Sequence, residues 1–316
     1  MFQKVEITRN ADANGKHTLS LLKHIYVERG TKEDWDSLSA LHYKGHNLAA
    51  GRRIMRCVYD DGEEKLLVGV MVFAYPMPLN KGRNRVFPWL KANQEGRDST
   101  LVNKMRMKQI NRLLTWNNRI VLDTMFRSAG IAYRFVNLGY RMYCSEFGAS
   151  HVESNSSMAR FNPFWAKVGT KFVKPESAAA LEEGIDFFKH NFVAHPCDQK
   201  AILAELEAMP EGIRKVVEAK MRDFYYRKSA MEKSGDKMHI GMTRIDRLPI
   251  DKILREIVQL VFGSTIYWIW TNPDKNNPRK LPERIPLLAF DNQPGDKPFD
   301  FEKLVALNEQ LAKATK

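Results

Sequence analysis

The sequence is poor in the features that mark secreted and membrane-spanning proteins. Its only cysteines, Cys57, Cys144 and Cys197, are odd in number and widely spaced, which argues against a disulfide framework and indicates thiols in a reducing cytosol. No run approaches the roughly 18 consecutive apolar residues of a transmembrane helix. The first residues lack a charged-then-apolar signal pattern. We therefore expect a cytoplasmic protein that does not enter a membrane.

Several well-known catalytic motifs are also missing. The chain has no Walker A loop, no G-x-S-x-G elbow and no acidic pair of the nuclease type. His190, His195 and Cys197 are close in sequence, but no second cysteine pair or H-E-x-x-H pattern accompanies them. We therefore expect no metal site.

What the chain has in excess is positive charge. Its 316 residues include 50 Lys+Arg and 37 Asp+Glu, a formal charge of +13. Residues 79–119 hold ten basic and two acidic residues, or +8, with aromatic residues between them. Such a mixture suits a groove that neutralises phosphates and stacks on bases, although a solvated basic surface is the alternative. We predict nucleic-acid contacts from Lys81, Arg83, Arg85, Trp89, Lys104, Arg106, Lys108 and Arg112.

Hydrophobic patterning predicts an α/β fold. A capping-box pattern at Thr31 opens a helix, and two strands at 53–59 and 65–75 flank a turn at 60–63. Residues 120–122 indicate a buried strand, followed by an amphipathic helix from Gly130 and a strand at 151–158. Beyond residue 175 the pattern is mostly helical, interrupted by the apolar stretch 266–270. We therefore predict a domain at 1–175, with 79–119 as a basic insertion, and a mostly helical extension at 176–316.

The most specific local signal lies between the strand at 120–122 and the helix that follows. Arg127, Gly130 and Ala132 form an R-x-x-G-x-A string there. This arrangement places backbone N–H groups and the positive end of a helix where a pyrophosphate could dock. Gly130 permits close approach of the ligand, and Arg127 adds charge.

This string and its context resemble the GNAT acyltransferases, whose acyl-CoA-binding motif is Q/R-x-x-G-x-G/A. The resemblance covers about residues 22–175 and includes Asn162-Pro163-Phe164-Trp165-Ala166-Lys167-Val168-Gly169, which is similar to the family's F-Y-x-K-x-G segment. His42-Tyr43 and residues 159–164 resemble the branch of Mom-type phage DNA-modification proteins. The resemblance implies a GNAT-like mixed sheet flanked by helices, in a protein of a phage-infected bacterium.

The resemblance implies transfer of an acyl group, with acetyl as the first candidate, from CoA to an amine on a nucleic-acid base. It also implies that the nucleic-acid partner is double-stranded phage DNA. Acetyl-CoA or another acyl-CoA is then the cofactor. The resemblance assigns the acyl oxygen to backbone near Leu122 and Thr124, and the pantetheine arm to Asn155. It assigns the pyrophosphate to Arg127, Ser128, Ala129, Gly130, Ile131 and Ala132.

Direct attack on a thioester needs a base for the amine proton and an acid for the thiolate. His42, Asp123 and Glu153 are the candidate bases, and Asp123 is equally suited to fixing a turn. The family's usual tyrosine acid falls at Trp165, whose indole N–H is not acidic. Tyr43 is then the first candidate acid, with Ser154 and Ser156 as weaker ones.

Two other functions fit the same residues. One is an acetyltransferase for a protein or a small molecule, in which the basic insertion binds an acidic partner or the CoA phosphates. The other is a non-catalytic DNA-binding module on a degenerate GNAT fold, which Trp165 at the acid position would allow.

Overall fold

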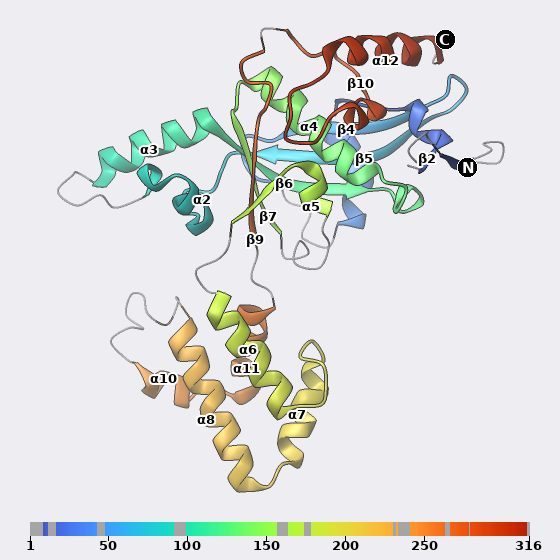
Figure 1. Cartoon of the computed structure of the whole chain (residues 1–316). Helices are drawn as coiled ribbons and strands as arrows, with labels where there is room; N and C mark the ends of the chain where they lie inside the picture. The colour runs from blue at the N-terminus through green and yellow to red at the C-terminus, as the bar shows by residue number, and fades with distance from the viewer. Residues whose placement is uncertain are drawn as a thin grey trace. The chain divides into compact units, whose positions relative to one another are not determined.

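The chain folds into two compact units in a computed structural model (Figure 1). The first comprises Met1–Val173 and Tyr267–Lys316, and the second comprises Lys174–Ile266. The structure describes residues 9–11, 17–42, 48–91, 99–156, 164–173, 178–229, 232, 241–262, 266–277 and 279–314. No helix in these ranges is long and apolar enough to cross a membrane.

A mixed eight-stranded sheet organises the first unit, with the strand order β10-β3-β4-β5-β6-β7-β9-β8. The pairs from β10 to β6 are antiparallel, as is β8 with β9, whereas β6 and β7 are parallel. The strands of this sheet are β3 Ile25–Arg29, β4 Arg53–Asp60, β5 Lys65–Ala74, β6 Leu114–Leu122, β7 His151–Ser156, β8 Lys171–Val173, β9 Ile266–Thr271 and β10 Ile285–Pro286. Two short strands, β1 Arg9–Ala11 and β2 His17–Leu19, pair separately.

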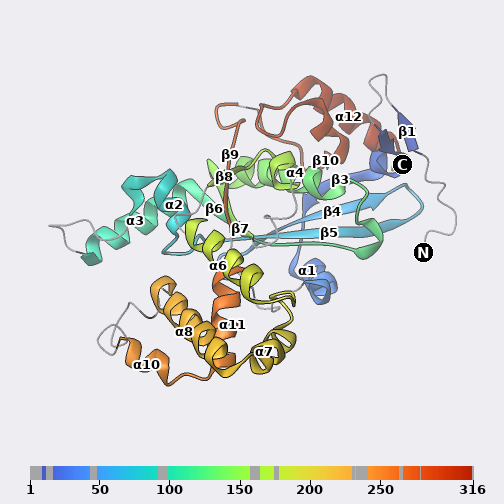
Figure 2. The same cartoon turned by 60° about the horizontal axis from the view of Figure 1, so that its bottom comes forward.

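Helices cover both faces of this sheet (Figure 2). The helices of the first unit are α1 Lys32–Leu38, α2 Lys81–Val86, α3 Ser99–Leu113, α4 Ile131–Phe147, α5 Phe164–Val168 and α12 Phe301–Ala314. Short 3-10 turns are η1 Ser20–His24, η2 Ser39–Leu41, η3 Pro88–Leu90, η4 Thr124–Phe126 and η6 Leu287–Asn292. The α/β class and the mixed sheet with flanking helices are as predicted.

Strand β5 shows why both faces are covered. Val70 and Val72 pack with Trp35 of α1, whereas Met71 and Phe73 face α4. Because successive side chains of a strand point to opposite faces, a strand buried on both sides has a continuous apolar sequence. Helix α4 comes so close to the sheet that a Cβ at Gly139 would lie 2.1 Å from the Met71 methyl group.

The predicted basic insertion supplies α2 and α3 between β5 and β6. Helix α2 begins after Asn80, whose side chain accepts from the amides of Gly82 and Arg83. Helix α3 leads directly into β6. In both views α2 and α3 lie together beside the start of β6 (Figures 1 and 2).

The described secondary-structure elements that lie wholly within the second unit are all helices. Its helices are α6 Ala178–Asn191, α7 Gln199–Ala208, α8 Glu211–Lys228, α10 Met242–Asp246 and α11 Ile250–Val261. Ile253 and Ile257 of the amphipathic α11 pack against Phe188, Met221 and Phe224 in a core of its own. This unit lies in the sequence between the adjacent antiparallel strands β8 and β9.

The domain division differs from the prediction at its C-terminal side. The first unit ends at Val173, close to the predicted change at residue 175, but Tyr267–Lys316 belong to that same unit and do not continue the helical extension. Strand β9 lies between β7 and β8, and β10 pairs with β3 at the far edge. The apolar side chains of Tyr267, Ile269 and Trp270 are buried there, which explains why this stretch belongs to the larger core.

Candidate functional site

The parallel strands β6 and β7, joined by α4, form the most distinctive part of the fold. Their ladder pairs Leu114 with His151, Thr115 with Val152 and Trp116 with Glu153. Beyond these three pairs β6 continues to Leu122 and β7 to Ser156, but the two strands are not paired with each other there in the described residues. The strands therefore part toward their carboxyl ends, where ligands of parallel α/β units usually bind.

The segment that leads from β6 into α4 has an unusual backbone. Ser128 and Gly130 both have positive φ, 64° and 73°. Gly130 is the N-cap of α4 and supplies no side-chain hydrogen bond to its amides. The first amides of a helix lack intrahelical acceptors, so this turn offers donors and a positive helix end to an anion.

Two predicted residues of this segment hold it in shape. The Asp123 carboxylate accepts from the Met125 amide at 2.9 Å, which is the turn-fixing role considered for it. The Arg127 guanidinium donates from Nε and Nη2 to the Leu122 carbonyl at 3.3 Å. Both Arg127 and Thr124 are exposed, and Leu122 is half-buried.

Polar groups lie on the strands just where they part. The Asn117 amide donates to the Tyr140 hydroxyl of α4 at 2.7 Å, and burial raises the pKa of that hydroxyl. The indole N–H of Trp116, at the last paired position of β6, is buried and meets no acceptor among the residues that the structure describes. The same holds for the indole N–H of Trp165, which lies on α5 and not on a strand. Asn155 is half-buried on β7. This part of the fold thus contains donors that protein groups leave unused.

His42 follows η2, which contacts β6. Its ring is half-buried and lies 5.9 Å from the Trp35 ring between centroids. This places His42 on the α1 face beside the strand that leads to the Gly130 turn. Tyr43 lies outside the described residues.

Glu153 and Arg83, predicted as a base and a nucleic-acid contact, form one buried ion pair instead. Arg83 Nη2 lies 2.5 Å from Glu153 Oε1 and Nε 2.9 Å from Oε2, with exposed side-chain fractions of 0% and 1%. The Tyr267 hydroxyl also donates to Oε2 at 2.9 Å. Arg83 is therefore withdrawn from any nucleic-acid surface, and the carboxylate of Glu153 is committed to neighbours in the core.

Arg106 is the second correction within the insertion. Its guanidinium donates to the Pro78 carbonyl at 2.8 Å, and only 8% of the residue is exposed. Desolvation by burial, helped by nearby Arg83, lowers the pKa of Arg106. The other predicted nucleic-acid residues are exposed on the surface, namely Lys81, Arg85, Trp89, Lys104, Lys108 and Arg112.

A polar stripe on α4 escaped the sequence reasoning. Arg134, Asn137 and Arg141 are buried at spacings of three and four residues. Arg134 pairs with Asp291 at 2.9 Å, and Arg141 with Asp274 at 2.5 Å. The 3.6-residue repeat of the three polar residues was the available signal. They attach the C-terminal segment to α4.

A cavity of about 550 Å³ lies beside the first turn of α4. Tyr133 and Phe290 line it with their rings 5.3 Å apart, and Lys167 Nζ lies 5.5 Å from the Tyr133 ring centroid. Lys171 also lines it, as does the ion-paired Asp291. Aromatic faces beside ammonium groups suit a planar ring that carries a phosphate.

Histidine and cysteine form no metal centre in the described part of the chain, where no group of three or more potential ligands occurs. His195 instead accepts from the Cys197 amide at 3.2 Å. Cys57 and Cys144 are buried, and burial raises the pKa of both thiols.

Searches of protein-family models and of curated proteins find no match for this sequence.

Proposed function

We propose that the protein is a GNAT-type N-acyltransferase that moves an acyl group from CoA to an amine on a nucleic-acid base. The observation that carries the proposal is the divergence of the parallel strands β6 and β7 next to the Gly130 turn. Acyl-CoA would use both features. Its pyrophosphate would bind the backbone amides at the start of α4, and its amide-bearing pantetheine arm would hydrogen-bond to the strand edges that β6 and β7 do not pair with each other.

The ligand would lie with its pyrophosphate on the first turn of α4. The amides from Ser128 to Ala132 would bind phosphate oxygens, and Arg127 would add charge from an exposed position. The pantetheine arm would enter between β6 and β7, beside Asn155. The cavity at Tyr133 and Lys167 offers a place for the adenosine end.

The reaction is attack of a base amine on the thioester carbonyl. The carbon–sulfur bond breaks, the thiolate leaves, and the amine gives up a proton. His42, which follows η2 beside β6, is the base that this arrangement favours, because imidazole accepts a proton near neutral pH. Glu153 does not serve, since its carboxylate is paired with Arg83. Tyr43 stays the proposed acid.

The insertion would hold the nucleic acid. Leu101, Lys104, Met105, Lys108 and Arg112 recur at helical spacing along α3, and all are exposed. The same helix turns Arg106 and Ile110 inward. An exposed face of cations with apolar groups between them suits a phosphate backbone and neighbouring base surfaces, and Trp89 adds an exposed ring for stacking.

Mass spectrometry of nucleosides from DNA of cells that contain the protein tests the activity directly. We expect a nucleoside whose added mass is that of an acyl group minus the hydrogen that it replaces, and its absence in cells with His42→Ala. Titration calorimetry with acetyl-CoA tests the donor separately. An unmodified nucleoside pool together with no heat on CoA addition would contradict the proposal.

Charge reversal on α3 tests the substrate side. The triple variant Lys104→Glu, Lys108→Glu, Arg112→Glu should lose DNA binding and keep CoA binding. Its matched control reverses exposed lysines outside the insertion, Lys65→Glu, Lys275→Glu and Lys297→Glu. DNA binding that falls equally in both variants would assign the effect to net charge and not to α3.

A further inference from the structure

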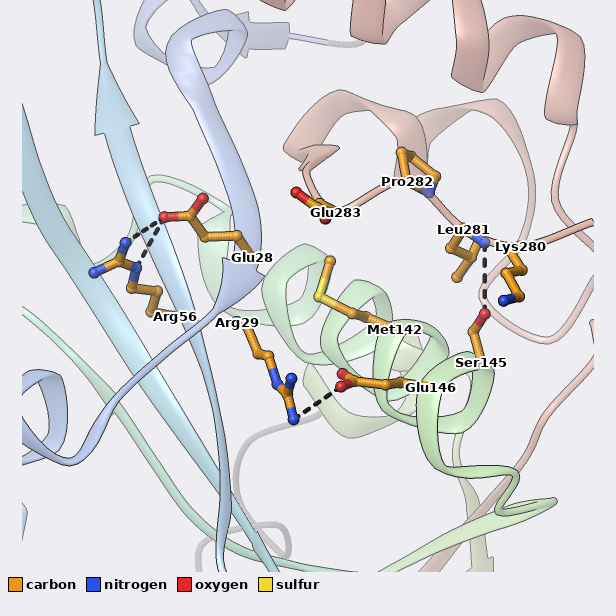
Figure 3. Close-up of a pocket in the computed structure, with 10 residues that line it drawn as sticks. All are labelled: Glu28, Arg29, Arg56, Met142, Ser145, Glu146, Lys280, Leu281, Pro282 and Glu283. Carbon is orange, nitrogen blue, oxygen red and sulfur yellow. Dashed lines mark hydrogen bonds and ion pairs between the residues drawn. The ribbon is translucent and has the colours of Figure 1, made fainter.

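A second cavity, of about 530 Å³, lies away from the Gly130 turn. It is formed by the end of β3, the C-terminal half of α4 and residues 280–283 (Figure 3). Ser145 on α4 lies 14 residues beyond Ile131, which corresponds to about 21 Å along the helix. A cavity of this size accommodates a small metabolite.

Ten residues line this cavity, and six of them are charged. Three are cations and three are anions, so the lining carries no net charge: Arg29, Arg56, Lys280, Glu28, Glu146 and Glu283. A polyphosphate such as CoA, or a nucleic acid, requires an excess of cations. The charges of this lining therefore disfavour the ligands proposed for the other site.

Most of these charges already have partners. Glu28 is held by Arg56 at 2.5 Å and by Arg284 at 2.9 Å, and Arg29 pairs with Glu146 at 2.9 Å. Lys280 and Glu283 are the exceptions, since neither has an ion-pair partner among the described residues. The cavity thus has one cation and one anion, Lys280 and Glu283, that form no ion pair among the described residues.

These two charged residues are the first and last of the segment 280–283. Figure 3 shows Lys280 and Glu283 separated by Leu281 and Pro282, with the Met142 side chain extending between this segment and β3. The Ser145 hydroxyl accepts from the Leu281 amide at 3.5 Å and so ties the segment to α4. The result is a floor of apolar groups between a positive and a negative end.

We propose that this cavity binds a small zwitterion of the amino-acid class. The carboxylate of the ligand would face Lys280, its ammonium group would face Glu283, and a short side chain would rest on Met142. A simple anion would be repelled by Glu283, and a simple cation by Lys280. Only a ligand that carries both charges satisfies both ends.

Titration calorimetry with free alanine, methionine and glutamine tests the proposal, with N-acetyl and amide derivatives of each as probes that lack one charge. We expect the free amino acids to bind at millimolar concentrations or below, and each blocked derivative to bind about tenfold more weakly. Dialanine, whose charges are farther apart, distinguishes a free amino acid from the ends of a peptide. Blocked derivatives that bind as well as free amino acids would overturn the assignment.

Charge reversals sharpen the test. Lys280→Glu and Glu283→Lys should each weaken binding about tenfold, whereas the double reversal should restore it because a zwitterion can turn around. Lys65→Glu, at an exposed end of β5, is the matched control and should bind like the parent. Unchanged binding in Lys280→Glu, or no binding of any free amino acid to the parent, would refute the proposal. Neither result depends on CoA or DNA.

Discussion

Replacement of Arg83 by leucine should destabilise the sheet unit strongly, because it leaves the Glu153 carboxylate buried without its cation. Two nitrogen–oxygen contacts of 2.5 and 2.9 Å join the pair, and neither side chain is exposed by more than 1%. Removal of one partner of such a pair costs about 3–5 kcal/mol. If Arg83 were exposed to solvent or DNA, its replacement would change the free energy of unfolding by about 0.5 kcal/mol or less.

The double variant Arg83→Leu, Glu153→Leu separates an ion pair from a packing effect. It removes both charges and leaves only the Tyr267 hydroxyl without its acceptor, at about 1–3 kcal/mol. The double variant should therefore be more stable than the single one. Arg85→Leu, exposed on the same helix, is the control.

Urea unfolding followed by tryptophan fluorescence measures these differences in the relevant unit. All six tryptophans of the chain belong to the sheet unit, and residues 174–266 contain none. The fluorescence change therefore reports the unit that holds the ion pair. A loss below about 1 kcal/mol in Arg83→Leu, or a double variant less stable than the single one, would refute a buried pair.

Three further perturbations follow from the structure. Gly130→Val should weaken CoA binding about tenfold, because φ of 73° costs an L residue about 1–2 kcal/mol; Gly148→Val, with φ of 74° at the other end of α4, should leave calorimetric CoA affinity unchanged. Burial lowers the pKa of His151 in the folded protein. The free energy of unfolding measured in urea should therefore fall as the pH drops from 7.5 toward 5.5, below the histidine pKa of about 6.5 in the unfolded chain. The fall should be smaller in His151→Gln. Arg141→Met should destabilise the unit by about 3–5 kcal/mol and speed hydrogen exchange near Asp274, and unchanged exchange would contradict the anchoring role.

Local signals in the sequence predicted much of the fold. The Thr31 capping box occurs as expected, with Asp34 as its reciprocal partner. The turn at 60–63 joins β4 and β5, and the apolar repeat from Gly130 is the buried face of α4. These features depend on residues within one or two turns of one another, so a single sequence contains them in full.

Features that depend on distant partners could not be predicted in the same way. Strand β6 begins at Leu114 and not near residue 120. The polar residue Asn117 interrupts the apolar pattern that would have indicated a buried strand, and only the fold supplies its buried partner, Tyr140 of α4. Arg83 is buried because Glu153, 70 residues later, neutralises it. A charged residue without a nearby partner in the sequence is expected to be exposed to solvent. Only the folded structure shows the distant partner that allows it to be buried.

The candidate site also contains one feature set by neighbouring residues and others that depend on residues far apart in the sequence. The start of α4 at Gly130 was predicted from a local pattern, and Gly130 there is the N-cap with a positive φ, a conformation that glycine adopts readily. The side chains assigned to chemistry come from separate elements, and the structure keeps His42 beside β6 but commits Glu153 to the core. Backbone sites are encoded locally, whereas side-chain constellations are not.

Some cations of the basic insertion are buried inside the fold and others are exposed on its surface. Only the exposed ones can neutralise DNA phosphates, so they limit its electrostatic affinity for DNA. Arg83 and Arg106 are buried, so five basic residues of the predicted interface remain exposed, namely Lys81, Arg85, Lys104, Lys108 and Arg112. Lys91, which was not among the predicted contacts, is a sixth exposed cation in the described part of the insertion. If all six neutralise phosphates, the logarithm of the DNA association constant should fall with the logarithm of salt concentration at a slope of about −5. Filter binding across a salt series measures this slope. A much steeper slope would require cations from beyond the insertion, and a slope near zero would remove DNA as its partner.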